Sequence, residues 1–341
     1  MPTSHTTTAA GNTGSGAEHP WTRRALRTTA AFSIAVLTLT NCASSQPAPS
    51  DPVPTPTVTN GVEGLHLPIE IYMLTPKQAT EYDWVRQAAT GACMKRYGQD
   101  YPVVPQPTSD SQMYGLLNRR YGVADTQTAR AWGYHNPTTG HASDGSPDSA
   151  PVTIGQMKDT TRTVLTGADP KTGARAPEFA GKALPEHGCG AELERLMPAA
   201  AGGPGGPASG GEGLVTAIKA QTFTESQTDP KVVTAVAAWS SCMKSRGYNL
   251  TDPLHATDNV TSLDDPAPGT AEIAQALTDV ACKHETNLIG IWFAAESDRQ
   301  NTLINAHAED FAKAKTALTV EVAQLDKLRN HDWTQEAQPA S

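Results

Sequence analysis

A six-residue motif occurs twice in this chain, as Cys-Met-Lys-Arg-Tyr-Gly at 93–98 and as Cys-Met-Lys-Ser-Arg-Gly at 242–247. Each copy follows an Ala-rich apolar stretch with helical spacing. Its final Gly adopts the left-handed conformation of a helix C-terminus without steric cost, so each helix should end there. The repeat of this Cys-Met-Lys motif therefore predicts two helices with the same ending, a Cys on the buried face and a Lys whose charge opposes the helix dipole.

The N-terminal 42 residues have the features of an export signal. Residues 1–20 are rich in Thr, Ser and Gly, and a basic group at Arg23, Arg24 and Arg27 precedes an apolar run at 30–40. That run is too short to span a bilayer but is typical of a signal peptide. It ends in Leu-Thr-Asn-Cys at 39–42, which resembles the lipobox of bacterial lipoproteins and departs from it at Asn41, where a small residue is usual.

The lipobox resemblance implies that Cys42 is diacylated and becomes the first residue of the mature protein. Two acyl chains suffice for stable membrane attachment, so we expect an anchor on the outer face of the cytoplasmic membrane, with secretion as the alternative. Residues 43–65 then form a flexible tether. The Arg pair also resembles a twin-arginine signal, against the alternative of an ordinary basic segment for general secretion.

Four cysteines remain once Cys42 is assigned to lipid, and an even number in an exported chain predicts two disulfides. Three pairings are open. The repeat favours Cys93 with Cys189 and Cys242 with Cys282, because it assigns one Cys-Met-Lys motif and one later Cys to each half. A bridge between Cys93 and Cys242 would contradict this arrangement. The chain has no Cys-x-x-Cys spacing, which argues against a dithiol oxidoreductase or a four-cysteine zinc site.

Helical periodicity dominates the remainder, and alternating strand patterns are nearly absent. We predict a mainly α fold of two disulfide-stapled halves, at 66–198 and 214–330, joined by a flexible Gly/Pro/Ala-rich linker at 199–213 and followed by a tail at 331–341. Capping residues, prolines and glycines predict helices at 75–97, 111–121, 126–132, 154–165, 192–197, 230–246 and 270–282, and a long helix at 288–328 that is bent or broken somewhere.

Composition and motifs exclude several functions. The formal charge of −9 argues against nucleic-acid binding and fits a basic partner or the cell wall. Ser241 and Lys244 match the Ser-x-x-Lys pattern of penicillin-interacting serine enzymes, and 171–173 matches their Lys-Thr-Gly. Those enzymes place Lys-Thr-Gly downstream on a strand, whereas here it lies upstream in a loop. We therefore expect no catalytic residues of this type, no metal and no cofactor.

Candidate ligand residues are few. Tyr134, His135, Trp239 and Tyr248 could line a pocket, although aromatic side chains in a chain with 6% aromatic residues are often required for the core. A loop with His135, His141, Asp144 and Asp148 could hold a metal, against the alternative of a solvated loop. His307 falls on the apolar series of the long helix, which indicates a core or interface position.

Several segments also resemble a group of uncharacterised secreted or lipid-anchored proteins of actinobacteria. They are the lipobox-like Cys42, Arg-Tyr-Gly at 120–122, Gly-Tyr-His at 133–135, Gly-Cys at 188–189, Trp-Ser-Ser-Cys-Met-Lys at 239–244 and Asp-Val-Ala-Cys at 279–282. The group implies no established activity. We therefore expect a non-catalytic binding or interaction module at the cell envelope, with an envelope protein or cell-wall partner. The alternatives are an envelope hydrolase that uses the His135 region, and a solute-binding lipoprotein of a transporter, which would contain two α/β lobes.

Overall fold

The computed structural model describes residues 51–103, 105–106, 115–136, 156–197 and 211–333, with the side chains at 211–212 excepted. The predicted export signal, Cys42, residues 43–50 of the tether and the residues His141, Asp144 and Asp148 lie outside the described residues. The rest of the predicted tether is described, and it packs against the main core: Val58 is buried, and its N–H donates to the Asn287 side chain. All of the described residues belong to one compact unit of the chain. Its secondary structure is mainly α-helical, as predicted.

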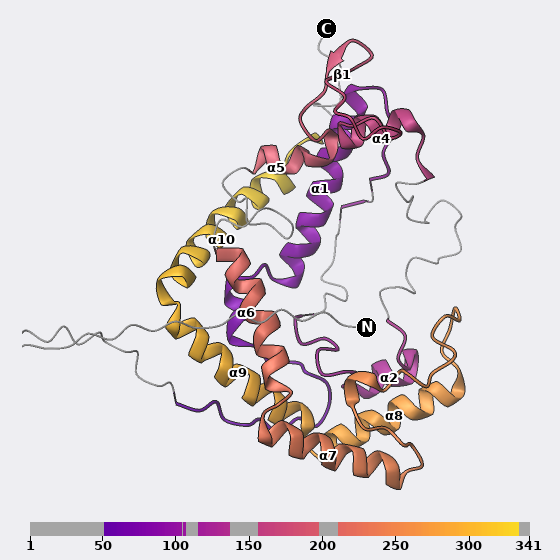
Figure 1. Ribbon diagram of the computed structural model, residues 1–341, viewed down its shortest axis with the longest axis vertical. Coiled ribbons are helices and arrows are strands. Elements are labelled where there is room, and N and C mark those ends of the chain that lie inside the picture. The colour runs from indigo at the N-terminus through magenta and orange to yellow at the C-terminus, as the bar shows by residue number, and fades with distance from the viewer. Residues whose placement is uncertain (1–50, 104, 107–114, 137–155, 198–210, 334–341) are drawn as a thin grey trace, which may run out of the picture. The chain divides into compact units, whose positions relative to one another are not determined.

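The first half contains one long helix, α1, with the short helices α4 and α5 beside it, whereas the short helix α2 lies next to α8 (Thr270–Glu285) (Figure 1). The Thr75 side chain caps α1 by accepting a hydrogen bond from the Gln78 N–H, which confirms the predicted start. The elements in chain order are η1 (Pro68–Tyr72), α1 (Pro76–Arg96), α2 (Thr126–Trp132), α4 (Asp159–Thr166), β1 (Glu178–Phe179), β2 (Lys182–Ala183), η3 (Cys189–Ala191) and α5 (Glu192–Leu196). β1 and β2 form an antiparallel hairpin.

One predicted helix is wrong over its described part. Residues 115–121 form turns rather than the C-terminal end of a helix at 111–121. Arg119 has a φ of 57°, in the left-handed region that a helix excludes. The next two side chains, Arg120 and Tyr121, donate hydrogen bonds to Glu296, an acid 175 residues or more further along the chain. These tertiary contacts override the local helical pattern.

The second half contains the longer helices. They are α6 (Gly211–Ser226), α7 (Pro230–Ser245), α8 (Thr270–Glu285), α9 (Leu288–Ala306) and α10 (Ala308–Arg329), with a 3-10 turn η5 at Pro253–His255. The predicted break in the long helix is confirmed and lies at His307, which is exposed. A core position for His307 is therefore wrong, because the residue ends α9 instead of continuing its apolar face, and the alternative of an interface position stays a prediction. α6 was not predicted.

The two Cys-Met-Lys motifs end their helices in the same way. The Gln99 N–H donates to the Met94 carbonyl, and the Tyr248 N–H donates to the Met243 carbonyl, with Gly98 and Gly247 at φ values of 67° and 90°. This is the hydrogen bond of a Schellman ending. Each Met is fully buried. The repeated sequence thus specifies a repeated local structure.

Both predicted disulfides are present. Cys93 and Cys189 have their Cα atoms 5.5 Å apart, and Cys242 and Cys282 have theirs 5.7 Å apart. The first bridge lies in a small apolar cluster, here called the Cys93 cluster, formed by Cys93, Met94, Val164, Leu165, Leu184 and Cys189. The second joins α7 to α8 at the edge of the main core, a much larger cluster that contains Trp239, Met243, Val280 and Trp292.

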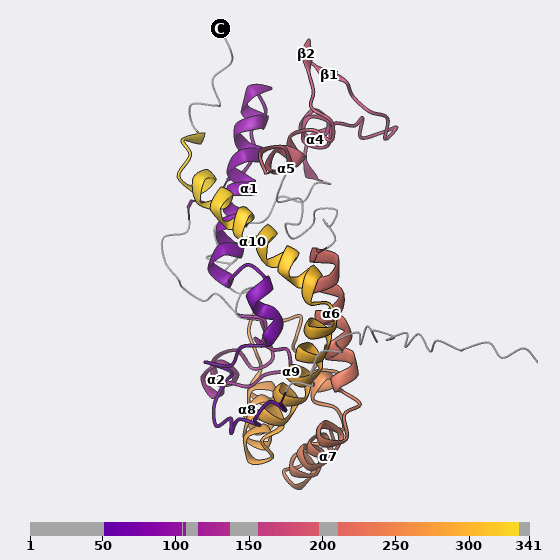
Figure 2. The same ribbon diagram turned by 90° about the vertical axis from the view of Figure 1, so that its left-hand side faces the viewer.

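The predicted halves share their cores. The main core includes Tyr121 and Tyr134 from the first half, and a third cluster joins Val85 of α1 to Leu325 and Leu328 of α10. Figures 1 and 2 show α1 beside α10 and α2 beside α8, in agreement with their contacts. The predicted boundary therefore does not separate the apolar cores. Of the linker at 199–213, residues 211–213 belong to α6 and the rest lies outside the described residues. Among the described helices, none is long and apolar enough to cross a membrane.

Candidate functional site

Three buried acids, Glu272 and Asp279 on α8 and Glu296 on α9, connect the helices of the second half to residues 119–135 of the first. Buried carboxylates are costly unless they are paired and hydrogen-bonded. Each of these three acids has several hydrogen-bonding partners. Most of the partners belong to the segments Arg-Tyr-Gly at 120–122, Gly-Tyr-His at 133–135 and Trp-Ser-Ser-Cys-Met-Lys at 239–244.

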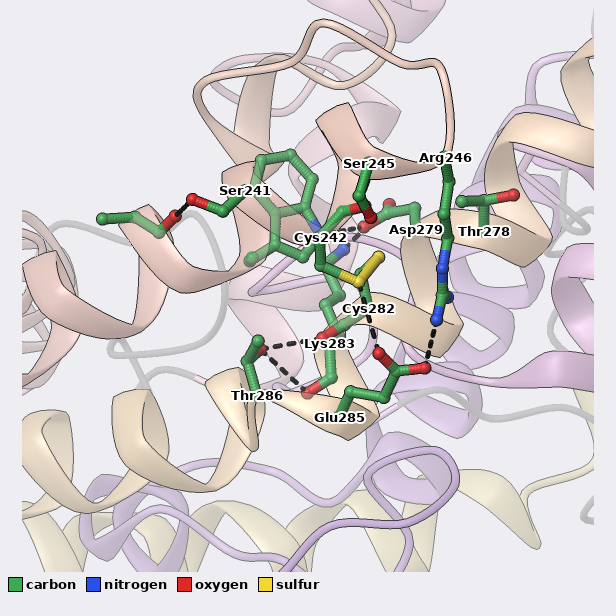
Figure 3. Close-up of a disulfide and its surroundings, with 12 residues drawn as sticks. Ser241, Cys242, Ser245, Arg246, Thr278, Asp279, Cys282, Lys283, Glu285 and Thr286 are labelled. Carbon is green, nitrogen blue, oxygen red and sulfur yellow. Dashed lines mark hydrogen bonds and ion pairs between the residues drawn. A yellow bond between two sulfur atoms is a disulfide. The ribbon is translucent and has the colours of Figure 1, made fainter.

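Asp279 has the most buried environment. Its carboxylate accepts hydrogen bonds from the Trp239 indole N–H (2.9 Å), the Tyr134 hydroxyl (3.3 Å) and the Lys283 ammonium (3.0 Å). The Lys283 ammonium also donates to the Val123 carbonyl at 2.9 Å. Both charged side chains have no exposed surface, and they lie one helical turn apart on α8 beside the Cys242–Cys282 bridge (Figure 3). Burial raises the pKa of Asp279 and lowers that of Lys283, while their mutual attraction opposes both shifts.

Glu272 holds His135 in a cationic form. The His135 Nδ1 lies 2.8 Å from a Glu272 carboxylate oxygen, and Nε2 lies 3.0 Å from the Asp265 carbonyl oxygen. Because both partners are acceptors, both ring nitrogens must carry hydrogen. The hydrogen bond to Glu272 raises the pKa of His135. Burial opposes ionisation of Glu272, but hydrogen bonds from Ser262, His135 and the Tyr134 N–H outweigh it and lower the pKa of Glu272.

Glu296 is fully buried and binds Arg120. The Arg120 guanidinium donates from Nε to both carboxylate oxygens at 3.0 Å, and the Tyr121 hydroxyl (2.8 Å) and the Gln300 amide (3.0 Å) donate to the same carboxylate. The guanidinium also donates to the Lys219 carbonyl, which ties α6 into the network. This satisfied network explains why residues 120–121 do not continue a helix.

Two glycines complete these contacts. A Cβ atom on Gly122 would lie 2.6 Å from the Lys283 ammonium nitrogen, and one on Gly133 would lie 2.6 Å from a Glu272 carboxylate oxygen. Both glycines also have positive φ, which disfavours any other residue. The Arg-Tyr-Gly and Gly-Tyr-His segments thus consist of residues that bind the buried acids or make room for them.

The predicted ligand residues take part in this network. Tyr134 and Trp239 are buried and meet at Asp279, His135 is held by Glu272, and Tyr248 packs half-buried against the main core. The polar groups of Tyr134, His135 and Trp239 are bonded within the protein, which gives these three residues a structural role. Ligand binding by the four residues stays a prediction.

A fourth acid, Glu321 on α10, differs from the three above. Its side chain is buried, and its Oε1 atom has no hydrogen-bond partner within the described part of the chain. Burial raises the pKa of Glu321 to about 7. This carboxyl group therefore exchanges its proton near neutral pH, whereas hydrogen bonds hold Glu272 ionised.

The Ser-x-x-Lys match has no catalytic geometry. The Ser241 hydroxyl donates to the Ala237 carbonyl of its own helix at 2.9 Å, and Lys244 is exposed at the end of α7. The Lys-Thr-Gly match at 171–173 lies in a turn, where Asp169 accepts hydrogen bonds from the Lys171 and Thr172 N–H groups. The structure therefore agrees with the sequence argument against a serine enzyme of this class.

An accessible site lies elsewhere, between α1, residues 100–103 with Gln106, and residues 329–333 that end and follow α10. This cavity has a volume of about 870 Å³, and its lining includes the aromatic side chains of Trp84, Tyr101 and Trp333. We call it the aromatic cleft. Pockets of roughly 300 to 1,000 Å³ are typical of sites for small organic ligands.

Small residues of α1 let the chain around Val103 pack close to this helix. Ala88, Gly91 and Ala92 line the cleft, and a Cβ atom on Gly91 would lie 2.5 Å from a Val103 methyl carbon. Glycine at this position therefore lets residues 100–103 pack directly on α1.

The two basic side chains of the cleft lining, Lys95 and Arg329, are each paired with an acid. Lys95 pairs with Asp100 at 3.1 Å, and Arg329 pairs with the buried Glu81 at 2.7 Å. The Trp333 indole N–H has no hydrogen-bond partner within the described residues, and the ring is positioned by packing, including an edge contact with the His331 ring. No group of acids, histidines or cysteines in the described residues could hold a metal ion.

Sequence reasoning missed the aromatic cleft because its lining comes from two segments more than 200 residues apart. No periodicity links Trp84 to Trp333. The available signal was weak: of six Trp residues in the chain, five lie outside the motif segments, and nothing in the sequence singles out Trp84 and Trp333 among them. Comparison of the chain with protein-family models, curated proteins and solved structures gives no match.

Proposed function

We propose that this protein is a non-catalytic binding module of the cell envelope, anchored by lipid at Cys42 on the outer face of the cytoplasmic membrane. Its ligand occupies the aromatic cleft. The observation that carries the proposal is the cleft itself, a cavity of about 870 Å³ with aromatic walls and paired charges. Residues 43–50 then connect the lipid-bearing Cys42 to the folded body, since Val53 and Val58 are already hydrogen-bonded to Asp298 and Asn287.

The disulfides support export. Bridges of this kind persist in oxidising compartments outside the cytoplasm and are rare within it. Both bridges lie between helices or turns distant in sequence, with separations of 96 and 40 residues. Together with the basic group, the apolar run and the lipobox-like Cys42, they support an extracytoplasmic location.

The hydrogen bonds of His135 and the pairing of Asp279 with Lys283 argue against the hydrolase alternative that depends on the His135 region. A general base requires a free lone pair near the substrate. His135, the residue on which the hydrolase alternative depends, uses both ring nitrogens as donors. The charged residues Asp279 and Lys283 are fully buried and paired.

The architecture also argues against the solute-binding alternative. A transporter lipoprotein of that class would contain two α/β lobes. The described chain has a single two-stranded sheet with two residues per strand, and its remaining regular elements are helical.

The anchor has a direct test. Replacing Cys42 with Ser removes the thiol that carries the lipid, so we expect the protein to move from the membrane fraction to the medium. Fractionation of cells and immunoblotting measure this change, and incorporation of labelled fatty acid into the wild-type protein alone identifies the lipid. A Cys42→Ser protein that stays tightly bound to membranes would contradict the anchor and leave the cleft to be tested separately.

A further inference from the structure

We infer that the aromatic cleft binds an uncharged carbohydrate chain. This inference rests on the proposed function, in which the cleft is the ligand site, and it names the chemical class of the ligand. The argument uses the aromatic walls, the paired charges and the polar groups of the lining, all of which belong to described residues.

The aromatic side chains supply flat apolar surfaces. Trp84 and Trp333 are half-buried and pack with their ring bodies against the cluster of Val85, Leu325 and Leu328. Rings fixed in this way lose little conformational freedom when a ligand binds. The negative face of an indole or phenol attracts weakly positive C–H groups, and a sugar ring presents such groups on its faces. Stacking of sugar rings on these walls follows from that complementarity.

The charges favour a neutral ligand. Lys95 and Arg329 already have the carboxylates of Asp100 and Glu81 as partners. A phosphate or carboxylate ligand would have to compete with these acids for the basic groups, and a cationic ligand would have to compete with Lys95 and Arg329 for the acids. An uncharged ligand leaves both pairs intact.

The polar lining suits hydroxyl groups. The amide NH2 groups of Gln106 and Asn330 donate to the Arg329 and Asp326 carbonyls, which leaves the amide oxygens of these two cleft residues as acceptors. Sugar hydroxyls can donate hydrogen bonds to such oxygens. At about 870 Å³ the cavity is near the upper end of the usual range for ligand sites, which favours several linked rings over a single sugar.

The test uses the full chain with Cys42→Ser, so that the exported protein is soluble and keeps both disulfides. Short neutral oligosaccharides of glucose, mannose, galactose and arabinose are titrated by calorimetry and by tryptophan fluorescence. At least one series should bind, and its affinity should be insensitive to salt because no charge is paired. Trp84→Ala and Trp333→Ala should each weaken binding about tenfold, the upper end of what one aromatic contact supplies.

Two further variants distinguish the loss of a ligand contact from the loss of folding. Trp132→Ala removes a half-buried Trp at the end of α2, outside the cleft, and should leave affinity unchanged. Gln106→Ala alters an exposed side chain of the cleft, so it should weaken binding a few-fold even if a Trp variant fails to fold.

The outcomes separate the two proposals. If an acidic sugar or a peptide binds in a Trp84-dependent manner and the neutral sugars do not, the carbohydrate inference is wrong and the cleft remains the ligand site. If a sugar binds equally well to wild type, Trp84→Ala, Trp333→Ala and Gln106→Ala, the cleft is not the site and both proposals are wrong.

Discussion

Replacing Asp279 with Ala is expected to lower the free energy of unfolding by about 3 to 5 kcal/mol, the usual cost of breaking a buried ion pair from one side. The substitution leaves the Lys283 ammonium buried without a counter-charge and removes the acceptor of the Trp239 and Tyr134 donors. Urea denaturation at neutral pH, followed by tryptophan fluorescence, measures the change.

A second substitution separates the charge effect from loss of packing. Adding Lys283→Met to Asp279→Ala removes the unpaired cation, so the double variant should be more stable than Asp279→Ala alone. As a matched control, Asp310→Ala on the exposed face of α10 breaks a surface pair with Lys313 and should change stability little. Equal stability of the single and double variants would contradict the proposed role of the buried pair.

Removal of the Cys93–Cys189 bridge is the other change with a large expected effect. It closes a loop of 96 residues, against 40 for Cys242–Cys282, and the entropy of the unfolded chain then predicts losses of about 5 and about 4 kcal/mol for the two double Cys→Ala variants. The first bridge also lies at the centre of a small apolar cluster. The segment at 157–197 should therefore become the first site of proteolysis when that bridge is absent.

The comparison of the two double variants has an internal control, because each keeps the other bridge. Urea denaturation gives the stability difference, and limited proteolysis with mass spectrometry locates the first cleavage. A larger loss for Cys242→Ala/Cys282→Ala, or first cleavage outside 157–197 in Cys93→Ala/Cys189→Ala, would contradict the account of the Cys93 cluster.

Local chemistry made part of the fold predictable. Thr75 and Asp229 accept hydrogen bonds from the N–H groups at the starts of α1 and α7, and Gly98 and Gly247 end the two motif helices with positive φ. These features depend on a few neighbouring residues, so the sequence contains them. The disulfide pairing was also predictable, since the repeated motif assigns one later Cys to each half.

Other features depend on residues far apart in the chain. α6 starts after a Gly-rich stretch without a capping signal, which explains why its periodicity was overlooked. Residues 115–121 have a helical pattern, but Arg120 and Tyr121 bond to Glu296 instead. The approach of α10 to α1, which forms the aromatic cleft, has no local signature.

The central claim, that the protein binds the cell envelope through the aromatic cleft, is tested most directly by cosedimentation. Released Cys42→Ser protein is mixed with isolated, protein-stripped envelopes of the source organism, and the sedimented fraction is measured for it and for added Trp84→Ala or Trp132→Ala. The account predicts that the Cys42→Ser and Trp132→Ala proteins sediment with the envelopes and that the Trp84→Ala protein stays in solution. Equal sedimentation of all three, or of none, would contradict it.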